Sequence, residues 1–286
     1  MPQINTKVLM SDARYFDDQQ AINAYMDDHV AVDVQKAMLE HQAIQNAFRE
    51  AGIEVVTVPA PENCQDGVYT ANWALICGRK AIMSNLPASR QPESPYAETM
   101  LRRLGFDIVR LPSEYRFSGQ GDALPCGNRL FVGTNYRTIL EMHPHLSRET
   151  ALEVISLQTI PETDISGNPV TNKVTGWPDS FFYDLDLALA VITPTLIAWC
   201  PEAFTPESQA RIRNLEGLEK IEVSYEEATK ASACNLVSTG ETVIMGSRAP
   251  QLKQALETYG LKVITVDVTE LMKGGGFIRC TSLTLK

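Results

Sequence analysis

The chain of 286 residues has only four histidines and no closely spaced pair of cysteines. Zinc sites and redox motifs are built from such clusters, whereas the six cysteines here stand singly between positions 64 and 280. His143 and His145 flank a proline; they could hold a metal, but the pattern is more typical of a solvated turn. We therefore expect reduced thiols and neither a metal centre nor a disulfide scaffold.

Basic clusters, long apolar runs and a dinucleotide-binding loop are also missing. The formal net charge is −10, and no run of Lys and Arg offers the phosphate neutralisation that nucleic-acid binding needs. No apolar run reaches 18 residues, no apolar signal region opens the sequence, and no GxGxxG follows a strand. These absences predict a cytoplasmic protein that binds neither nucleic acid nor membrane and uses no cofactor.

Internal repetition is the main feature that is present. One recurring pattern is a helix end, a glycine and a strand of alternating apolar residues, at 48–61, 101–114 and 256–269. A second pattern is two short strands around a glycine turn, at 76–84, 125–133 and 238–246. Such self-similarity indicates one supersecondary unit used several times. Because hairpins are antiparallel, the repeats favour a unit that closes on itself around a central cleft over a doubly wound parallel sheet.

The first unit has the clearest periodicity. Apolar residues recur at helical spacing over 33–50, the helix stops before Gly52, and strands are expected at 6–10 and 53–59. Segments 88–95 and 160–179 are rich in proline and polar residues, and we expect loops there, the second long enough to cover a cleft. No linker divides the sequence, so residues 1–286 are expected to form a single domain.

The stretch from Lys273 to Ser282 contains a candidate nucleophile. Its three consecutive glycines allow sharp bending or a close approach by other atoms, and Cys280 follows a cation, Arg279. A positive neighbour favours the thiolate, which is the nucleophilic form of cysteine. Alternation from Cys280 to Leu285 predicts a closing strand, with the thiol held at the rim of a sheet. The alternative is a small buried cysteine without chemistry.

Acids and amides stand before apolar strands at three other places. Asp66 and Asn72 precede the strand at 74–76, Asp122 closes a glycine-rich stretch, and Asp184 and Asp186 lie two apart in an apolar run. Residues two apart in a strand face the same side, so two carboxylates there need a cation or a shared proton between them. A guanidinium ligand would supply that cation. A strand edge facing water is the alternative.

In chain order, the motifs DGVYTAN, FSGQGDAL, GTNYRT, FYDLDLAL and GGGFIRCTSLTL resemble those of the guanidino-group-modifying enzymes, the pentein superfamily. This superfamily contains arginine deiminase, dimethylarginine dimethylaminohydrolase, the amidinotransferases and arginine dihydrolase. The resemblance covers nearly the whole chain and implies an α+β fold, a five-bladed αβ-propeller of pseudo-repeats. It also implies a hydrolase whose cysteine thiolate attacks the guanidinium carbon of arginine or a related guanidino or ureido amino acid. A covalent thiouronium then forms, and ammonia or an amine is released.

The resemblance assigns roles to individual residues. Cys280 matches the nucleophile, and the substrate-binding positions are matched by Asp66, Asn72, Asp122 and Asp186. Most members have an aspartate at the Asn72 position, whereas the arginine dihydrolase branch has asparagine. Arg137 and Arg90 fall near the arginines that bind the α-carboxylate of the substrate, a task suited to bidentate pairing.

Two departures from the family pattern affect the predicted chemistry. The catalytic histidine is replaced by Asp184, and the usual glutamate is replaced by Ser118. Asp184 could accept a proton if burial and Asp186 raise its pKa, and Tyr183 could donate one. Three hypotheses follow: a hydrolase, an arginine-binding protein without turnover on the same scaffold, and an assembly protein that binds no small molecule. The substrate, the number of nitrogens released and the formation of a homodimer stay open.

Overall fold

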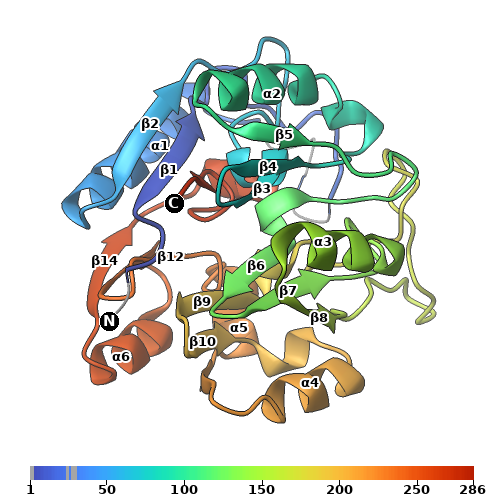
Figure 1. Ribbon diagram of the computed structural model, residues 1–286. Coiled ribbons are helices and arrows are strands. Elements are labelled where there is room, and N and C mark those ends of the chain that lie inside the picture. Colours follow the sequence, from blue (N-terminus) through green and yellow to red (C-terminus); the bar gives the residue numbers. More distant parts are fainter. Residues whose placement is uncertain (1–2, 24–25, 27–30) are drawn as a thin grey trace.

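The computed structural model describes residues 3–23, 26 and 31–286, which form five three-stranded sheets. Figure 1 shows these sheets arranged as a ring, with helices such as α2, α4 and α6 on its outside. In every sheet the middle strand pairs antiparallel with one neighbour and parallel with the other. The predicted five-bladed αβ-propeller is therefore confirmed, and the doubly wound alternative is wrong.

The first blade joins segments from opposite ends of the sequence. Strand β1 (Lys7–Ser11) lies between β15 (Leu283–Thr284), to which it is antiparallel, and β2 (Glu54–Val58), to which it is parallel. Helix α1 (Val34–Glu50) connects β1 to β2, and its N-cap Asp33 accepts a hydrogen bond from the amide of Lys36 at 3.0 Å. The helix and both strands predicted in this unit are confirmed.

The other four blades repeat the order strand, strand, helix, strand. Their elements are β3 (Ala74–Cys77), β4 (Lys80–Met83), α2 (Glu93–Arg103) and β5 (Asp107–Val109); β6 (Ala123–Cys126), β7 (Arg129–Gly133), α3 (His143–Thr150) and β8 (Glu153–Leu157); β9 (Leu189–Thr193), β10 (Leu196–Trp199), α4 (Pro206–Arg213) and β11 (Glu219–Glu222); and β12 (Val237–Ser238), β13 (Thr242–Gly246), α6 (Pro250–Thr258) and β14 (Lys262–Val266). A short helix, α5 (Tyr225–Lys230), lies between β11 and β12. The three predicted hairpins are all present.

Four local predictions are wrong. The strand expected over 280–285 is limited to β15, because residues 278–281 form a turn. Asp184 and Asp186 do not share a strand, since Asp186 lies in a 3-10 turn, Leu185–Leu187. Helix α2 begins inside the expected loop 88–95, and His143 begins α3 instead of forming a solvated turn. In each case a short helical or turn segment satisfies backbone groups where the pattern suggested extended or irregular chain.

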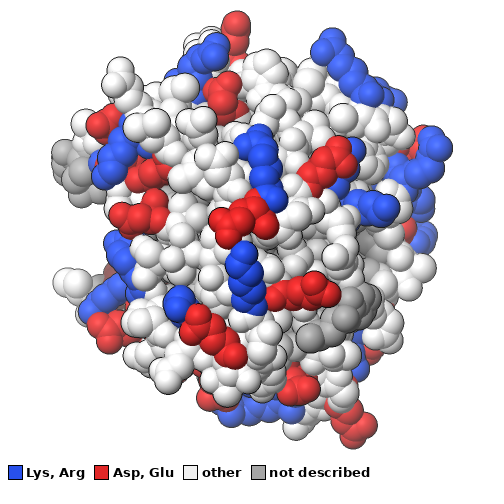
Figure 2. Space-filling model, turned by 90° about the vertical axis from the view of Figure 1, so that its left-hand side faces the viewer, with Lys and Arg blue, Asp and Glu red and all other residues white. Residues whose placement is uncertain are grey.

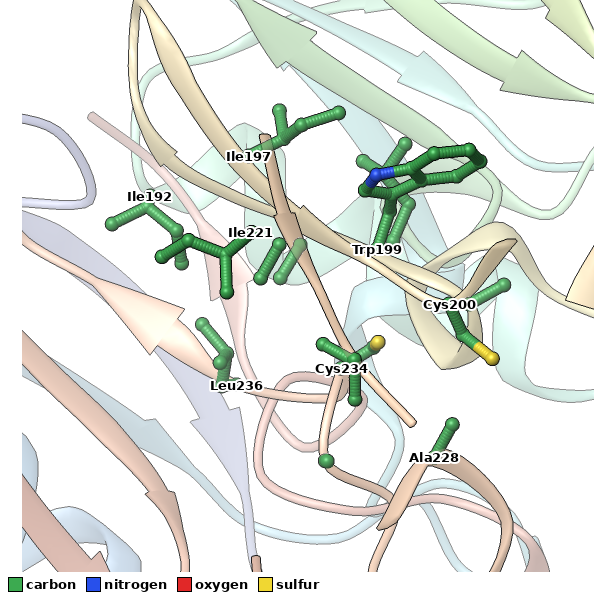
Figure 3. Close-up of a cluster of buried hydrophobic side chains, with 14 of the residues drawn as sticks. Ile192, Ile197, Trp199, Cys200, Ile221, Ala228, Cys234 and Leu236 are labelled. Atoms are coloured by element: carbon green, nitrogen blue, oxygen red, sulfur yellow. The ribbon is translucent and has the colours of Figure 1, made fainter. Parts of the chain in front are cut away.

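Packing between neighbouring blades holds the ring together. Figure 3 shows part of one core cluster, in which Ile192, Ile197 and Trp199 of the fourth blade lie near Cys234 and Leu236, which lead into the fifth. Trp199 is fully buried. Burying a large apolar side chain contributes about 1.5–3 kcal/mol, so this shared cluster couples the stability of adjacent blades.

The surface and the helices of the described residues carry two further observations. Figure 2 shows Lys and Arg interspersed with Asp and Glu over the face it displays, unlike the basic stripe typical of nucleic-acid binding. Among residues 3–23, 26 and 31–286, no helix combines the length and the apolar character needed to cross a bilayer.

Candidate active site

Each blade places a polar side chain in the segment that leads into its first strand. Asn72 lies in the 3-10 turn before β3, Asp122 directly before β6, and Asp186 in the turn before β9. Asn235 stands two residues before β12, and Cys280 stands in the turn before β15. The five-fold arrangement brings these segments together in the middle of the ring, where side chains from different blades contact one another.

Cys280 is buried and has a polar partner on either side of its sulfur. Its Sγ donates to Asp186 Oδ2 at 3.3 Å and accepts from Asn235 Nδ2 at 3.1 Å. Burial, followed by the negative charge of Asp186, raises the pKa of the Cys280 thiol well above its ordinary value. Burial therefore opposes the thiolate that the neighbouring Arg279 was expected to favour.

Asn235 also fixes the backbone of the cysteine turn. Its Oδ1 accepts hydrogen bonds from the amides of Arg279, at 2.9 Å, and Cys280, at 3.2 Å. The Asn235 side chain is completely buried. One amide thus orients both the sulfur and the chain that carries it.

Asn72 connects the two residues that replace the family's histidine and glutamate. Its Nδ2 donates to Ser118 Oγ at 2.9 Å and to Asp184 Oδ2 at 2.8 Å, and its Oδ1 accepts from Arg90 Nη1 at 2.9 Å. Asp184 Oδ1 is buried without a hydrogen-bond partner among the described residues. Asp184 and Ser118 therefore contact Asn72, whereas Asp186 is the carboxylate that contacts the sulfur.

The guanidinium of Arg90 forms its hydrogen bonds with other groups of the protein. Its Nε and Nη2 pair with the two oxygens of Glu93 at 2.7 and 2.8 Å, and Nη2 also donates to the carbonyls of Asp66 and Tyr69. Burial opposes its charge, but Glu93 raises the pKa of Arg90 above its ordinary value. These contacts suit a residue that positions Asp66 and Asn72, and they leave little capacity to bind a substrate carboxylate.

Four carboxyl groups are concentrated in this site, from Asp66, Asp122, Asp184 and Asp186, and each is at most 2% exposed. Burial raises the pKa of Asp66 to about 6. Burial, followed by the charge of Asp184, raises the pKa of both Asp122 and Asp186 well above its ordinary value. These carboxyl groups therefore favour their protonated forms in the resting site. A cation that enters the site would favour their ionised forms instead.

Arg137 is a buried cation at the same place. Its guanidinium lies 4.6 Å from the centre of the Tyr183 ring, and its Nη2 donates to the carbonyl of Ile22 at 2.8 Å. Its remaining N–H groups form no hydrogen bond or ion pair with the residues that the structure describes. Arg137 thus has the donors needed to hold a carboxylate, which is its predicted task.

The space between these groups is small. A cavity of about 10 Å³ is lined by Cys280, Asp66, Asn72, Arg90 and Arg137, among others. This volume holds about one water molecule, so a guanidino amino acid can enter only after side chains or loops move. The glycine run packs tightly against this space: a Cβ on Gly276 would overlap the ring of Tyr69.

The structure brings all nine predicted site residues into one connected region, although only five line the small cavity. Ser118, Asp122, Asp184 and Asp186 lie behind these five; Asp122 Oδ1, for example, accepts from the amide of Leu185 at 2.9 Å. The sequence reasoning missed Asn235. Only its position in the sequence could have indicated Asn235, because the fourth hairpin, β12–β13, is also preceded by a polar residue in an apolar run.

Comparisons with known proteins identify relatives over the whole fold. A family model described as N,N dimethylarginine dimethylhydrolase, eukaryotic, matches residues 11–285. The bifunctional arginine dihydrolase/ornithine cyclodeaminase ArgZ of Synechocystis is 28% identical over 97% of this chain, which spans 37% of the length of that relative. The N(G),N(G)-dimethylarginine dimethylaminohydrolase of Mycobacterium tuberculosis is 28% identical over 96% of this chain and 84% of its own.

A solved structure extends this similarity to three dimensions. The N-terminal domain of an ArgZ variant, covalently bound to a reaction intermediate, superposes with a TM-score of 0.87. It is 26% identical, and the match covers 98% of this chain and 97% of that domain. The ring of five sheets is therefore shared with a domain that forms a covalent intermediate.

Proposed function

Because the chain belongs to the N,N dimethylarginine dimethylhydrolase family, and with it to the pentein superfamily, we propose that it is a C–N hydrolase acting on amidines. Its substrate is arginine or a related guanidino amino acid, and Cys280 is the nucleophile. The observation that carries the proposal is the position of the Cys280 sulfur, buried in the ring at 3.3 Å from Asp186 Oδ2 within a cluster of protonatable carboxyls.

The substrate supplies a further positive charge, next to the sulfur. A guanidinium held by Asp66 and Asn72 places a cation beside the sulfur and the carboxyl cluster. That cation lowers the pKa of the Cys280 thiol and of its acidic neighbours, because an opposite charge a few ångströms away favours each ionised form. Arg137 holds the α-carboxylate of the same substrate by charge-assisted hydrogen bonds. Binding and activation of the nucleophile are thus one event.

Proton transfer follows the contacts of the sulfur. Once the bound cation has favoured loss of the Asp186 proton to solvent, the thiol proton passes to Asp186 Oδ2, and the thiolate forms a bond to the guanidinium carbon. The tetrahedral adduct then breaks its C–N bond, and the leaving nitrogen takes the proton from Asp186. Water next adds to the thiouronium carbon, and the C–S bond breaks to release the product and the thiol. The contacts favour Asp186 over Asp184 as the first proton acceptor, with Asp184 and Ser118 orienting Asn72.

Replacement of the nucleophile tests the proposal. Cys280→Ser is expected to lower turnover by roughly three orders of magnitude or more, because an alcohol is a far weaker nucleophile at neutral pH. Mass spectrometry of reactions with arginine, dimethylarginine, citrulline and agmatine identifies the products. Cys77→Ser is the matched control, since Cys77 lies at the end of β3, does not line the small cavity, and donates its thiol hydrogen to the Thr150 carbonyl. Turnover that survives in Cys280→Ser would refute the role of the thiol.

A second candidate is an arginine-binding protein without turnover. It is favoured by the acid–base positions, because Asp184 and Ser118 are both bound to Asn72 and neither contacts the sulfur. Calorimetry that detects arginine binding, with no ammonia, citrulline or ornithine formed, would support it. The double substitution Asp184→His with Ser118→Glu should then create turnover.

A further inference from the structure

A second cavity, of about 480 Å³, reaches the middle of the ring and shares no lining residue with the small cavity at Cys280. Its outer end lies at three hairpin turns, marked by Gly78, Gly127 and Pro194. Its inner end lies at the buried residues Gln120 and Asp186. Binding sites for small molecules typically have volumes of about 300–1,000 Å³, so this cavity is large enough for one.

The walls and the inner end of this cavity differ in chemistry. The walls carry apolar residues from all five blades or the segments that adjoin their strands: Ile76, Leu124, Leu189, Val191, Leu236 and Leu285. The inner end carries two charged residues, Arg279 and Asp186. An apolar body ending in a few placed polar groups is the usual composition of a ligand pocket.

Arg279 has donors to spare at this inner end. Its Nη1 donates to the Ser282 carbonyl and to Thr284 Oγ1, and its Nη2 donates to Gln120 Oε1 at 3.0 Å. Its Nε and one of the two hydrogens of Nη2 form no hydrogen bond with the described residues. Nε and Nη2 share one edge of the guanidinium, and such an edge can bind a carboxylate in bidentate fashion.

Asp186 connects the two cavities. Its Oδ2 accepts from the Cys280 thiol, whereas its Oδ1 is buried without a hydrogen-bond partner among the described residues. A buried oxygen without a partner is costly. Asp186 thus contacts the nucleophile and is also one of the residues that line the larger cavity.

We propose that the larger cavity binds a small monocarboxylate with an apolar tail, its carboxylate on Arg279, and that occupancy slows the reaction of Cys280. The direction follows from charge. The positive charge of Arg279 favours the ionised forms of Asp186 and of the sulfur, and a bound carboxylate offsets that charge and makes the thiolate harder to form. The proposal concerns the acidity of the thiol, so it stands or falls independently of any hydrolytic turnover.

The test uses octanoate below its micelle concentration, with 1-octanol and octylammonium as controls of the same tail length. Calorimetry measures binding, and mass spectrometry of the peptide containing Cys280 measures its rate of alkylation by iodoacetamide. Octanoate is expected to bind saturably and to slow alkylation roughly threefold, the effect of raising the thiol pKa by about half a unit. Equal slowing by 1-octanol or octylammonium would overturn the proposed carboxylate recognition, and no saturable octanoate binding would overturn the site.

A matched pair of variants locates the effect. Ile76→Phe adds volume to a half-buried residue of the wall, and Ile165→Phe makes the same substitution at a fully exposed residue outside the cavity. Ile76→Phe is expected to weaken octanoate binding at least tenfold and to leave the ligand-free alkylation rate unchanged. Ile165→Phe should behave as the wild type. Octanoate binding that survives in Ile76→Phe would place the ligand elsewhere, and binding without any change in alkylation would refute the coupling through Asp186.

Discussion

Replacing Asn235 by alanine should both destabilise the protein and make its thiol less reactive. The Asn235 side chain is fully buried and contacts the cysteine turn through three hydrogen bonds. Two of them satisfy the backbone amides of Arg279 and Cys280, and the third is donated to the sulfur. A single truncation therefore removes the support of the nucleophile without touching the nucleophile itself.

The size of the effect on stability follows from the two amides. Each buried N–H left without an acceptor costs about 1–3 kcal/mol. Water entering the space vacated in Asn235→Ala can restore part of this loss. We therefore expect the free energy of unfolding to fall by about 2–4 kcal/mol. Loss of the donor to the sulfur also destabilises the thiolate, so the pKa of the Cys280 thiol should rise further.

Urea unfolding followed by tryptophan fluorescence measures the stability change, since Trp73 and Trp199 are buried reporters. The pH dependence of Cys280 alkylation measures the acidity of the thiol. Asn214→Ala is the control, because Asn214 is exposed at the end of α4, and it should change stability by less than about 0.5 kcal/mol. Equal stability of the two variants, with unchanged alkylation profiles, would refute the assigned role of Asn235.

Three further predictions concern other parts of the site. Burial raises the pKa of Asp66 to about 6, so the stabilising effect of its proton is complete below its ordinary pKa and is lost as the pH rises through about 6. In urea titrations, Asp66→Asn should therefore gain stability relative to the wild type across that range, and a constant difference would contradict this. Gly276→Ala should lower the melting temperature, because its methyl group would overlap the Tyr69 ring; an unchanged melt would show that the ring can move at little cost. Glu93→Gln should cost about 3–5 kcal/mol by removing the charge partner of a buried arginine, whereas Glu226→Gln, at an exposed ion pair, should leave the stability nearly unchanged.

Much of the fold could be predicted from the sequence because the conformation of its turns depends on the residues in the turns themselves. The predicted helix ends at Gly52, Gly105 and Gly260 and the hairpin turns at Gly78 and Gly127 all adopt positive φ, between 58° and 88°. Other residues reach this region only at a cost, so glycine marks it in the sequence. Recurrence of these marks identified the repeated unit before any tertiary contact was known.

The site could be predicted only in part, because alternation of polar and apolar residues does not distinguish a strand from a tight turn. Asp184 and Asp186 alternate with apolar neighbours, as in a strand. Asp186 lies in a 3-10 turn, however, and only Asp186 contacts the sulfur. Asn235 carried no charge and belonged to no motif, so only its place before a hairpin distinguished it. The acidity of Cys280 depends on burial by residues distant in sequence, and no local pattern records that.

The pairing of β15 with β1 also has a consequence for biosynthesis. Until the ribosome has added residues 283–284, the ring stays open, and the cysteine just before them cannot be enclosed by the blades made earlier. A chain that stops before residue 283 therefore lacks an assembled candidate site, whatever its other blades have done. Enclosure of the cysteine depends on the pairing of two segments that lie more than 270 residues apart.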